Sequence, residues 1–121
     1  MNIEEFREYC LSVKAAEECM PFDDHILVYK VMDKMFAFAS LHPKDGKFWT
    51  TMKCNPEKSV ELMEQYTGIY FGPYSDKKHW ITIQLESDVP HSLIKELISH
   101  SVDEVIRKLP KIKQATYRQM S

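Results

Sequence analysis

The sequence predicts an α+β fold in two layers, with the element order α-β-β-β-α-β-β-α and a mostly antiparallel sheet covered by helices. Three stretches carry apolar residues at the spacing of an amphipathic helix. Five shorter stretches are rich in β-branched and aromatic residues, and most are separated by short turn-forming segments. Because short connections join antiparallel neighbours, we expect most of these strands to pair as hairpins under one layer of helices.

The first predicted helix covers residues 3–14, where apolar side chains recur on one face and the opposite face is acidic. Asn2 precedes this helix, and Glu5 stands three residues further on. This pair has the form of a capping box, in which each side chain accepts a hydrogen bond from the backbone N–H of the other. The sequence therefore predicts where the helix begins as well as its presence.

Three strands are predicted next, at residues 25–31, 35–41 and 48–54. The connection at 32–34 is short enough for a hairpin, and the connection at 42–46 contains the turn-forming residues proline, aspartate and glycine. The three strands should form an antiparallel meander.

A second helix is predicted at residues 56–66, because Asn55 is a favourable cap and Pro56 is tolerated at the first helical position. Gly68 is expected to end this helix in the left-handed conformation, which glycine adopts without a side-chain clash.

Two further strands are predicted at residues 69–71 and 79–85. A long third helix is predicted at residues 90–109, where two neighbouring rows of apolar residues recur at helical spacing, and Pro110 should end it.

We assign residues 1–112 to a single domain and residues 113–121 to a short basic C-terminal tail. The start of the chain lacks the basic and apolar pattern of an export signal, and the longest apolar run, near residues 35–39, is far below the roughly 20 residues that span a bilayer. The three cysteines are widely spaced and form no CxxC pair. We therefore expect a cytoplasmic protein with no membrane partner.

Several kinds of chemistry are not expected from the composition. The three glycines form no phosphate-binding loop, so no nucleotide cofactor is expected, nor any other cofactor. Cys54 can be paired on paper with His79 or His100, but it closes a predicted strand and is typical of a small buried side chain. We expect a non-enzymatic protein with no catalytic residues and no assigned metal ligands.

Basic residues gather at a few positions although the net charge is −2. The candidate nucleic-acid-binding residues stand in or beside predicted turns and are Lys34, Lys44, Lys47, Lys77, Lys78, His79 and Trp80. Lysines there would contact phosphates while the indole stacks on a base. The alternative is that lysines in turns favour solubility and that Trp80 anchors the core.

Four segments resemble blocks of the MmcQ/YjbR family over about residues 1–112. These are Pro21-Phe22 with Val28-Tyr29-Lys30-Val31-Met32-Asp33-Lys34-Met35-Phe36-Ala37 (family PFG…VFKVGGKMFA), Lys53-Cys54-Asn55-Pro56-Glu57 (the strand-to-helix junction), Lys77-Lys78-His79-Trp80 with Thr82 (family NKKHWNT), and His100-Ser101 through Lys108-Leu109-Pro110 (the closing helix).

The resemblance implies a fold like that of type III secretion chaperones and of the bacterial frataxin CyaY. It also implies DNA binding through two hairpins that act as a double wing. Tyr74 and Asp76 stand where the family commonly has histidine and asparagine, so a carboxylate lies beside Lys77 and Lys78 and would weaken a phosphate contact.

Two alternatives follow from the same resemblance. A chaperone-like fold can hold partner peptides, which would make this chain a protein-binding adaptor with methionines on an adaptable surface. Frataxins bind iron weakly on an acidic first helix, where this chain has Glu4, Glu5 and Glu8. A solvated helix face is the simpler interpretation of these three carboxylates.

Overall fold

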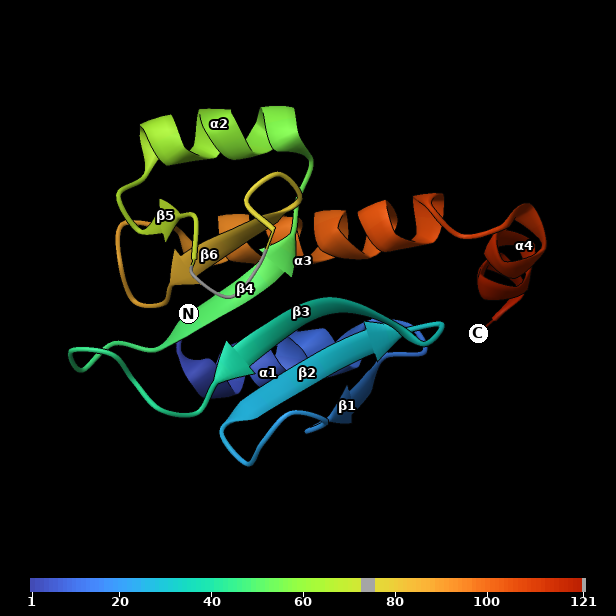
Figure 1. Cartoon of the computed structure of the whole chain (residues 1–121), viewed down its shortest axis with the longest axis horizontal. Coiled ribbons are helices and arrows are strands. Elements are labelled where there is room, and N and C mark those ends of the chain that lie inside the picture. The colour runs from blue at the N-terminus through green and yellow to red at the C-terminus, as the bar shows by residue number, and fades with distance from the viewer. Residues whose placement is uncertain (73–75, 121) are drawn as a thin grey trace.

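The structure is a computed structural model that describes residues 1–72 and 76–120, and it confirms the predicted α+β class (Figure 1). The elements are α1 (Ile3–Ser12), β1 (Glu17–Cys19), β2 (Ile26–Val31), β3 (Lys34–Ser40), β4 (Trp49–Lys53), α2 (Pro56–Gln65), β5 (Ile69–Tyr70), β6 (Trp80–Gln84), α3 (His91–Arg107) and α4 (Lys111–Gln119). Each predicted helix and strand is present, and its ends lie within a few residues of the prediction.

The described strands form a six-stranded sheet in the order β1-β2-β3-β4-β6-β5, and neighbouring strands are antiparallel. The predicted meander is confirmed as β2-β3-β4. After β4 the chain leaves the sheet through α2 and returns at the edge as β5, so β6 pairs with both β4 and β5. The turn from β2 to β3 consists of Met32 and Asp33, with φ of 50° and 67°, as a type I′ hairpin turn requires.

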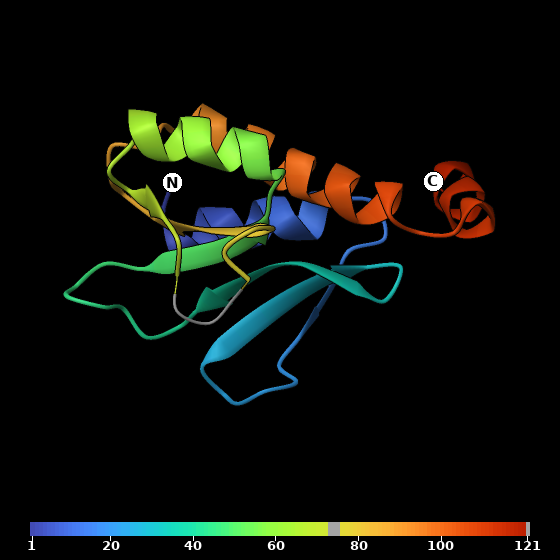
Figure 2. The ribbon, with the colours of Figure 1, turned by 45° about the horizontal axis from the view of Figure 1, so that its top comes forward.

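Helices α1, α2 and α3 lie on one face of the sheet (Figure 2). Beneath them the strands contribute fully buried side chains such as Tyr29, Met52 and Ile81. Phe6 of α1 packs edge-on against Tyr29, with 6.0 Å between the ring centroids. Burial of these apolar side chains is the main force that holds the helices on the sheet.

The opposite face of the sheet carries no helix in the described part of the chain, and we call it the open face (Figure 2). Cross-strand partners share a face, so the register places Val28, Phe38, Thr51 and Thr82 side by side there. The hydroxyls of Thr51 and Thr82 hydrogen-bond each other at 2.9 Å, and Gly72 packs directly against the Thr82 side chain. The open face is therefore covered in places by loops, with hollows between them.

Two elements differ from the predicted order. Strand β1 has three residues, too few for an alternation to be recognised. Residues predicted as a basic tail form helix α4, so the domain boundary expected at residue 112 falls inside a helix. The Tyr117 hydroxyl donates to the backbone carbonyl of Lys14 at 3.1 Å, and the Lys14 ammonium lies over the Tyr117 ring. These contacts dock α4 beside the end of α1.

The predicted helix starts are confirmed, since Asn2 and Glu5 form the capping box and Asn55 caps α2. The prediction for Gly68 is wrong. Its φ is not positive, and α2 already ends at Gln65, with Tyr66 as its C-cap. A glycine is needed at position 68 because a Cβ atom there would collide with the side chain of Ser87.

Candidate nucleic-acid interface

The lysines predicted to bind nucleic acid are divided between the two ends of β3. Lys34 is the first residue of this strand, whereas Lys44 and Lys47 follow its last residue. A strand of seven residues is about 20 Å long. The two ends of β3, which Figure 1 labels, are therefore too far apart for these three lysines to form one patch.

At the first end, Lys34 meets two lysines that the sequence did not single out for the site. Lys34, Lys53 and Lys108 line a hollow of about 380 Å³ together with Trp80. The Lys53 ammonium lies over the Trp80 ring, 5.4 Å from its centroid. Partial burial lowers the pKa of Lys53, and repulsion from Lys108 lowers it further. A bound anion would relieve this repulsion.

Lys77 and Lys78 are exposed in the turn that leads to this hollow, and they directly precede His79 and Trp80 in the chain. Asp76 holds the turn, because its carboxylate accepts from the backbone N–H of Lys78 at 2.8 Å and lies 2.7 Å from Nδ1 of His79. The His79 contact is the main reason that the pKa of Asp76 is lowered. Asp76 is thus a structural acceptor in the turn. Tyr74, the other departure from the family pattern, lies outside the described residues.

At the second end, Lys44 and Lys47 face each other across a tight turn. Their backbones exchange hydrogen bonds of 2.8 and 3.0 Å, and Asp45 and Gly46 between them have φ of 53° and 77°. The two lysines line a hollow of about 250 Å³ whose other walls include Trp49. Both ends of the open face thus combine lysines with a tryptophan.

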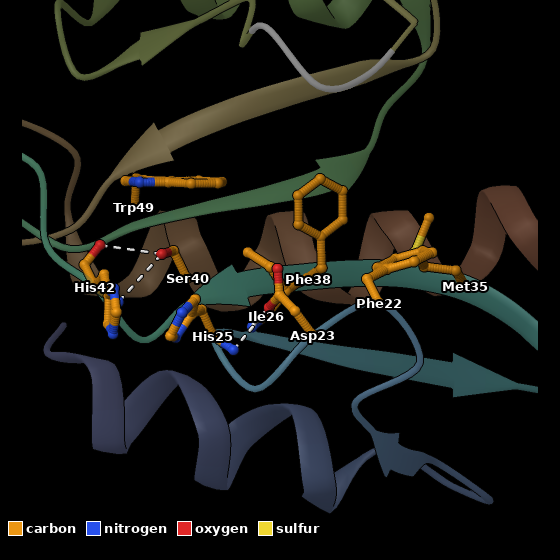
Figure 3. Close-up of a pocket in the computed structure, with 9 residues that line it drawn as sticks. All are labelled: Phe22, Asp23, His25, Ile26, Met35, Phe38, Ser40, His42 and Trp49. Atoms are coloured by element: carbon orange, nitrogen blue, oxygen red, sulfur yellow. Dashed lines mark hydrogen bonds between the residues drawn. The ribbon is translucent and has the colours of Figure 1, made fainter.

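The middle of the open face contains a larger and more apolar pocket of about 530 Å³ (Figure 3). Its lining residues are Phe22, Asp23, His25, Ile26, Met35, Phe38, Ser40, His42 and Trp49. Trp49 is also a wall of the hollow at Lys44 and Lys47, and Met35 is also a wall of the hollow at Lys34. The central pocket therefore shares one wall with each of the other two hollows. The hollow at Lys34 also has Val105 and Leu109 in its wall, so it lies where the open face meets the end of α3. We call the three hollows together the open-face groove.

Aromatic rings form the floor of this groove. Phe38 packs perpendicular to Trp49, with 6.2 Å between the ring centroids, and lies 6.1 Å from Trp80 on its other side. Trp49 and Trp80 are half-buried, so Trp80 is both a packing residue and part of the surface. Period-two alternation along each strand could have predicted that Phe38 and Trp49 point away from the helices. It could not have predicted that they lie beside Trp80, because the sequence pattern does not give the register between strands.

Cys54, His100 and the carboxylates of α1 lie outside the open-face groove. Within residues 1–72 and 76–120, no three His, Cys, Asp or Glu side chains gather closely enough to hold a metal ion. Cys54 is buried, as predicted, and burial raises the pKa of its thiol. Nε2 of His100 accepts from the backbone N–H of Asn55 at 3.1 Å, so this histidine links α3 to the cap of α2. None of the described helices has the length and apolar character to cross a membrane.

The fold and the groove define a class of small α+β proteins in which helices cover one face of an antiparallel sheet and the other face is open. The YjbR family model matches residues 11–103. The chain belongs to the YjbR family, as its sequence motifs indicated.

Relatives of similar length support this assignment. The chain is 27% identical to the uncharacterized protein YjbR of Escherichia coli K12 over 114 residues, covering 94% of this chain and 95% of that protein. It is 29% identical to the uncharacterized protein YbdF of Escherichia coli O157:H7 over 112 residues, covering 93% and 90%.

Two solved structures have the same fold. The crystal structure of Deinococcus radiodurans protein DR2400, with domain DUF419, superposes with a TM-score of 0.86 at 30% identity, covering 96% of this chain and 87% of that one. A protein from Pseudomonas syringae superposes with a TM-score of 0.72 at 24% identity, covering 84% and 96%.

Proposed function

We propose that this protein binds single-stranded nucleic acid along the open-face groove and has no enzymatic activity. The observation that supports this most strongly is the order of side-chain types along the groove. Lysines line the hollow at each end, and the pocket between them combines the rings of Phe22, Phe38 and Trp49 with a few polar side chains, among them Asp23. Phosphates would lie against the lysines, and unstacked bases against the rings.

A single strand fits this arrangement better than a duplex does. Bases in a duplex are stacked on each other and cannot lie on protein rings, whereas those of a single strand can. The net charge of −2 does not oppose the proposal, because much of the acidic charge lies elsewhere. Glu4, Glu5 and Glu8, for example, are exposed on α1, which lies on the opposite face of the sheet.

The proposal is tested by measuring the affinity for a labelled single strand and for the matching duplex over a range of salt concentrations. We expect tighter binding of the single strand, with log K falling by about 0.7 for each neutralised phosphate as log salt rises. Lys34→Glu/Lys47→Glu, which changes one lysine at each end of the groove, should weaken binding and flatten the salt dependence. Lys58→Glu/Lys95→Glu makes the same charge change on α2 and α3 and should leave binding unchanged. Equal effects of the two double variants would contradict the proposal.

A protein partner is the second candidate, and Phe22 favours it because 67% of this aromatic residue is exposed beside the central pocket. A large apolar side chain in that position is typical of an interaction surface. Weak, salt-insensitive binding of nucleic acid by the wild type, together with a stoichiometric protein complex that Phe22→Ala disrupts, would favour this candidate.

A further inference from the structure

The central pocket differs in charge from its two neighbours. Among the described residues that line it there is no lysine or arginine, and Asp23 alone is acidic. One neighbouring hollow has two lysines beside Asp45, and the other has three lysines. A phosphate is therefore disfavoured in the central pocket. A neutral, flat and largely apolar group is favoured there, which in a nucleic acid is the base.

The pocket has walls that suit one ring system. Phe38 and Trp49 meet at 84°, and Figure 3 shows Asp23 between the imidazole of His25 and the ring of Phe22. The ring centroids of His25 and His42 lie 3.8 Å apart, with the two ring planes tilted by 37°. A base inserted here would contact aromatic rings on more than one side, and Phe22 is exposed enough to turn toward it.

Asp23 supplies the polar contact that can distinguish one base from another. Its Oδ1 accepts from the backbone N–H groups of His25 and Ile26 at 2.7 and 3.1 Å, which fixes the carboxylate in the loop. The Ser40 hydroxyl is already used, since it donates to the carbonyl of His42 and accepts from its N–H. An ionised carboxylate only accepts hydrogen bonds, so its second oxygen requires a donor on the base.

Guanine satisfies this requirement best. Its pairing edge presents a ring N–H and an amino group side by side, and both can donate to one carboxylate oxygen. Adenine and cytosine present a ring nitrogen acceptor beside the amino group, and thymine and uracil present carbonyls on both sides of the ring N–H. These acceptors would face the lone pairs of the carboxylate oxygen, which repel them, so the contact favours guanine.

Building on the proposed function, we propose that the central pocket holds one unstacked guanine, read by Asp23 and enclosed by Phe22, Phe38 and Trp49. The strand on either side of this base runs over the lysines at the two ends of the groove. The protein then binds single strands that contain guanine in preference to those that do not.

The test compares labelled strands that differ at one position, an oligothymidylate and the same strand with a central guanine or a central adenine. The guanine strand should bind about tenfold or more tightly than the other two, in the range expected for one specific base contact. Asp23→Asn keeps an oxygen that can cap the loop and removes the charge, so within this variant the three strands should bind with equal affinity. Asp24→Asn is the matched control, because it removes the neighbouring carboxylate that does not line the pocket, and the preference should persist.

The other outcomes separate the two proposals. Tight binding of all three strands with equal affinity would overturn the guanine pocket and leave the proposed function standing. Failure of all strands to bind would overturn the proposed function. Guanosine alone would then be titrated into the Trp80→Phe variant, in which Trp49 is the remaining tryptophan and reports binding by its fluorescence. Absence of an Asp23-dependent signal would overturn the guanine pocket as well. Saturable binding of argininamide instead of guanosine would identify the pocket as a site for an organic cation.

Discussion

The backbone N–H of Asn55 donates a 3.1 Å hydrogen bond to Nε2 of His100, which ties the cap of α2 to the middle of α3. Nε2 can accept only when that nitrogen carries no proton, so the contact requires the neutral imidazole. The side chain of Asn55 is engaged at the same time, since its oxygen caps the backbone N–H groups of Glu57 and Lys58. The junction of β4, α2 and α3 thus depends on the protonation state of one histidine.

Acid is expected to weaken this junction. Burial lowers the pKa of His100, and repulsion from Lys58 lowers it further, whereas the pKa of an unfolded histidine is about 6.5. Below pH of about 6.5 the unfolded chain binds a proton that the folded chain does not. The contribution of His100 to stability is therefore fully present above that pH and is lost as pH falls through the folded pKa. Urea unfolding from pH 7.5 to 5 should show a decline that is shallower in His100→Gln; identical slopes would contradict this role.

Gly72 should tolerate no side chain because of Thr82. A Cβ atom at position 72 would collide with the Thr82 hydroxyl, which is hydrogen-bonded to Thr51 on the open face. Gly72→Ala is expected to destabilise the protein by about 1–3 kcal/mol, the usual range for overpacking. The loss should shrink in a Thr82→Ala background, where the colliding oxygen is gone.

Gly46 provides the contrast, because a Cβ atom there meets open space and the backbone has φ of +77°. Gly46→Ala should cost about 1 kcal/mol through backbone strain alone. This cost should be the same with threonine or alanine at position 82. Double-mutant cycles by denaturant unfolding measure the coupling of position 72 with position 82 and that of position 46 with position 82. A non-zero coupling between positions 46 and 82 would argue against the steric explanation.

The three cysteines should differ in reactivity. Cys10 and Cys54 are buried, and burial raises the pKa of both thiols, so few reactive thiolates form. Cys19 is partly exposed on the edge strand β1. Iodoacetamide should label Cys19 first in the native protein and reach the other two only after unfolding. Peptide mass mapping over time gives the order, and early labelling of Cys10 would show that α1 opens readily from the sheet.

The β2–β3 turn offers a stabilising substitution. Asp33 is exposed and has φ of 67°, a conformation that glycine adopts without the steric cost that other residues incur. Asp33→Gly should raise the free energy of unfolding by about 0.5–1 kcal/mol. Asp33→Ala is the control, since it removes the carboxylate and retains the strain. A gain of equal size in both variants would point to charge instead of backbone conformation.

Local patterns in the sequence were sufficient for most of the elements. Asn2 and Glu5 marked the start of α1, Asn55 and Pro56 marked the start of α2, and alternation marked the strands of the meander, because caps and side-chain periodicity involve neighbours along the chain. Local patterns did not predict strand β1 or helix α4. Strand β1 exists through its pairing with β2, and the docking of α4 involves a contact between Tyr117 and Lys14, far apart in sequence.

The candidate site was predictable in part. The sequence predicts Trp80 and Lys34 as site residues because they are aromatic or basic and stand near turns, and the structure places them in one hollow. Their partners Lys53 and Lys108 come from β4 and the end of α3, and no local signal joins them. The same applies to Gly68, whose role is set by Ser87 across a loop and not by the helix that precedes it.

The amino-acid sequence by itself determined the family, the fold class and the positions of the helices and strands, since these depend on short-range patterns of burial and hydrogen bonding. The tertiary structure decided where the lysines lie. It separated Lys34 from Lys47 by the length of β3 and placed an aromatic pocket between the two ends. Cross-strand register and the one-sided layer of helices are the physical causes, because together they determine which side chains remain on the open face.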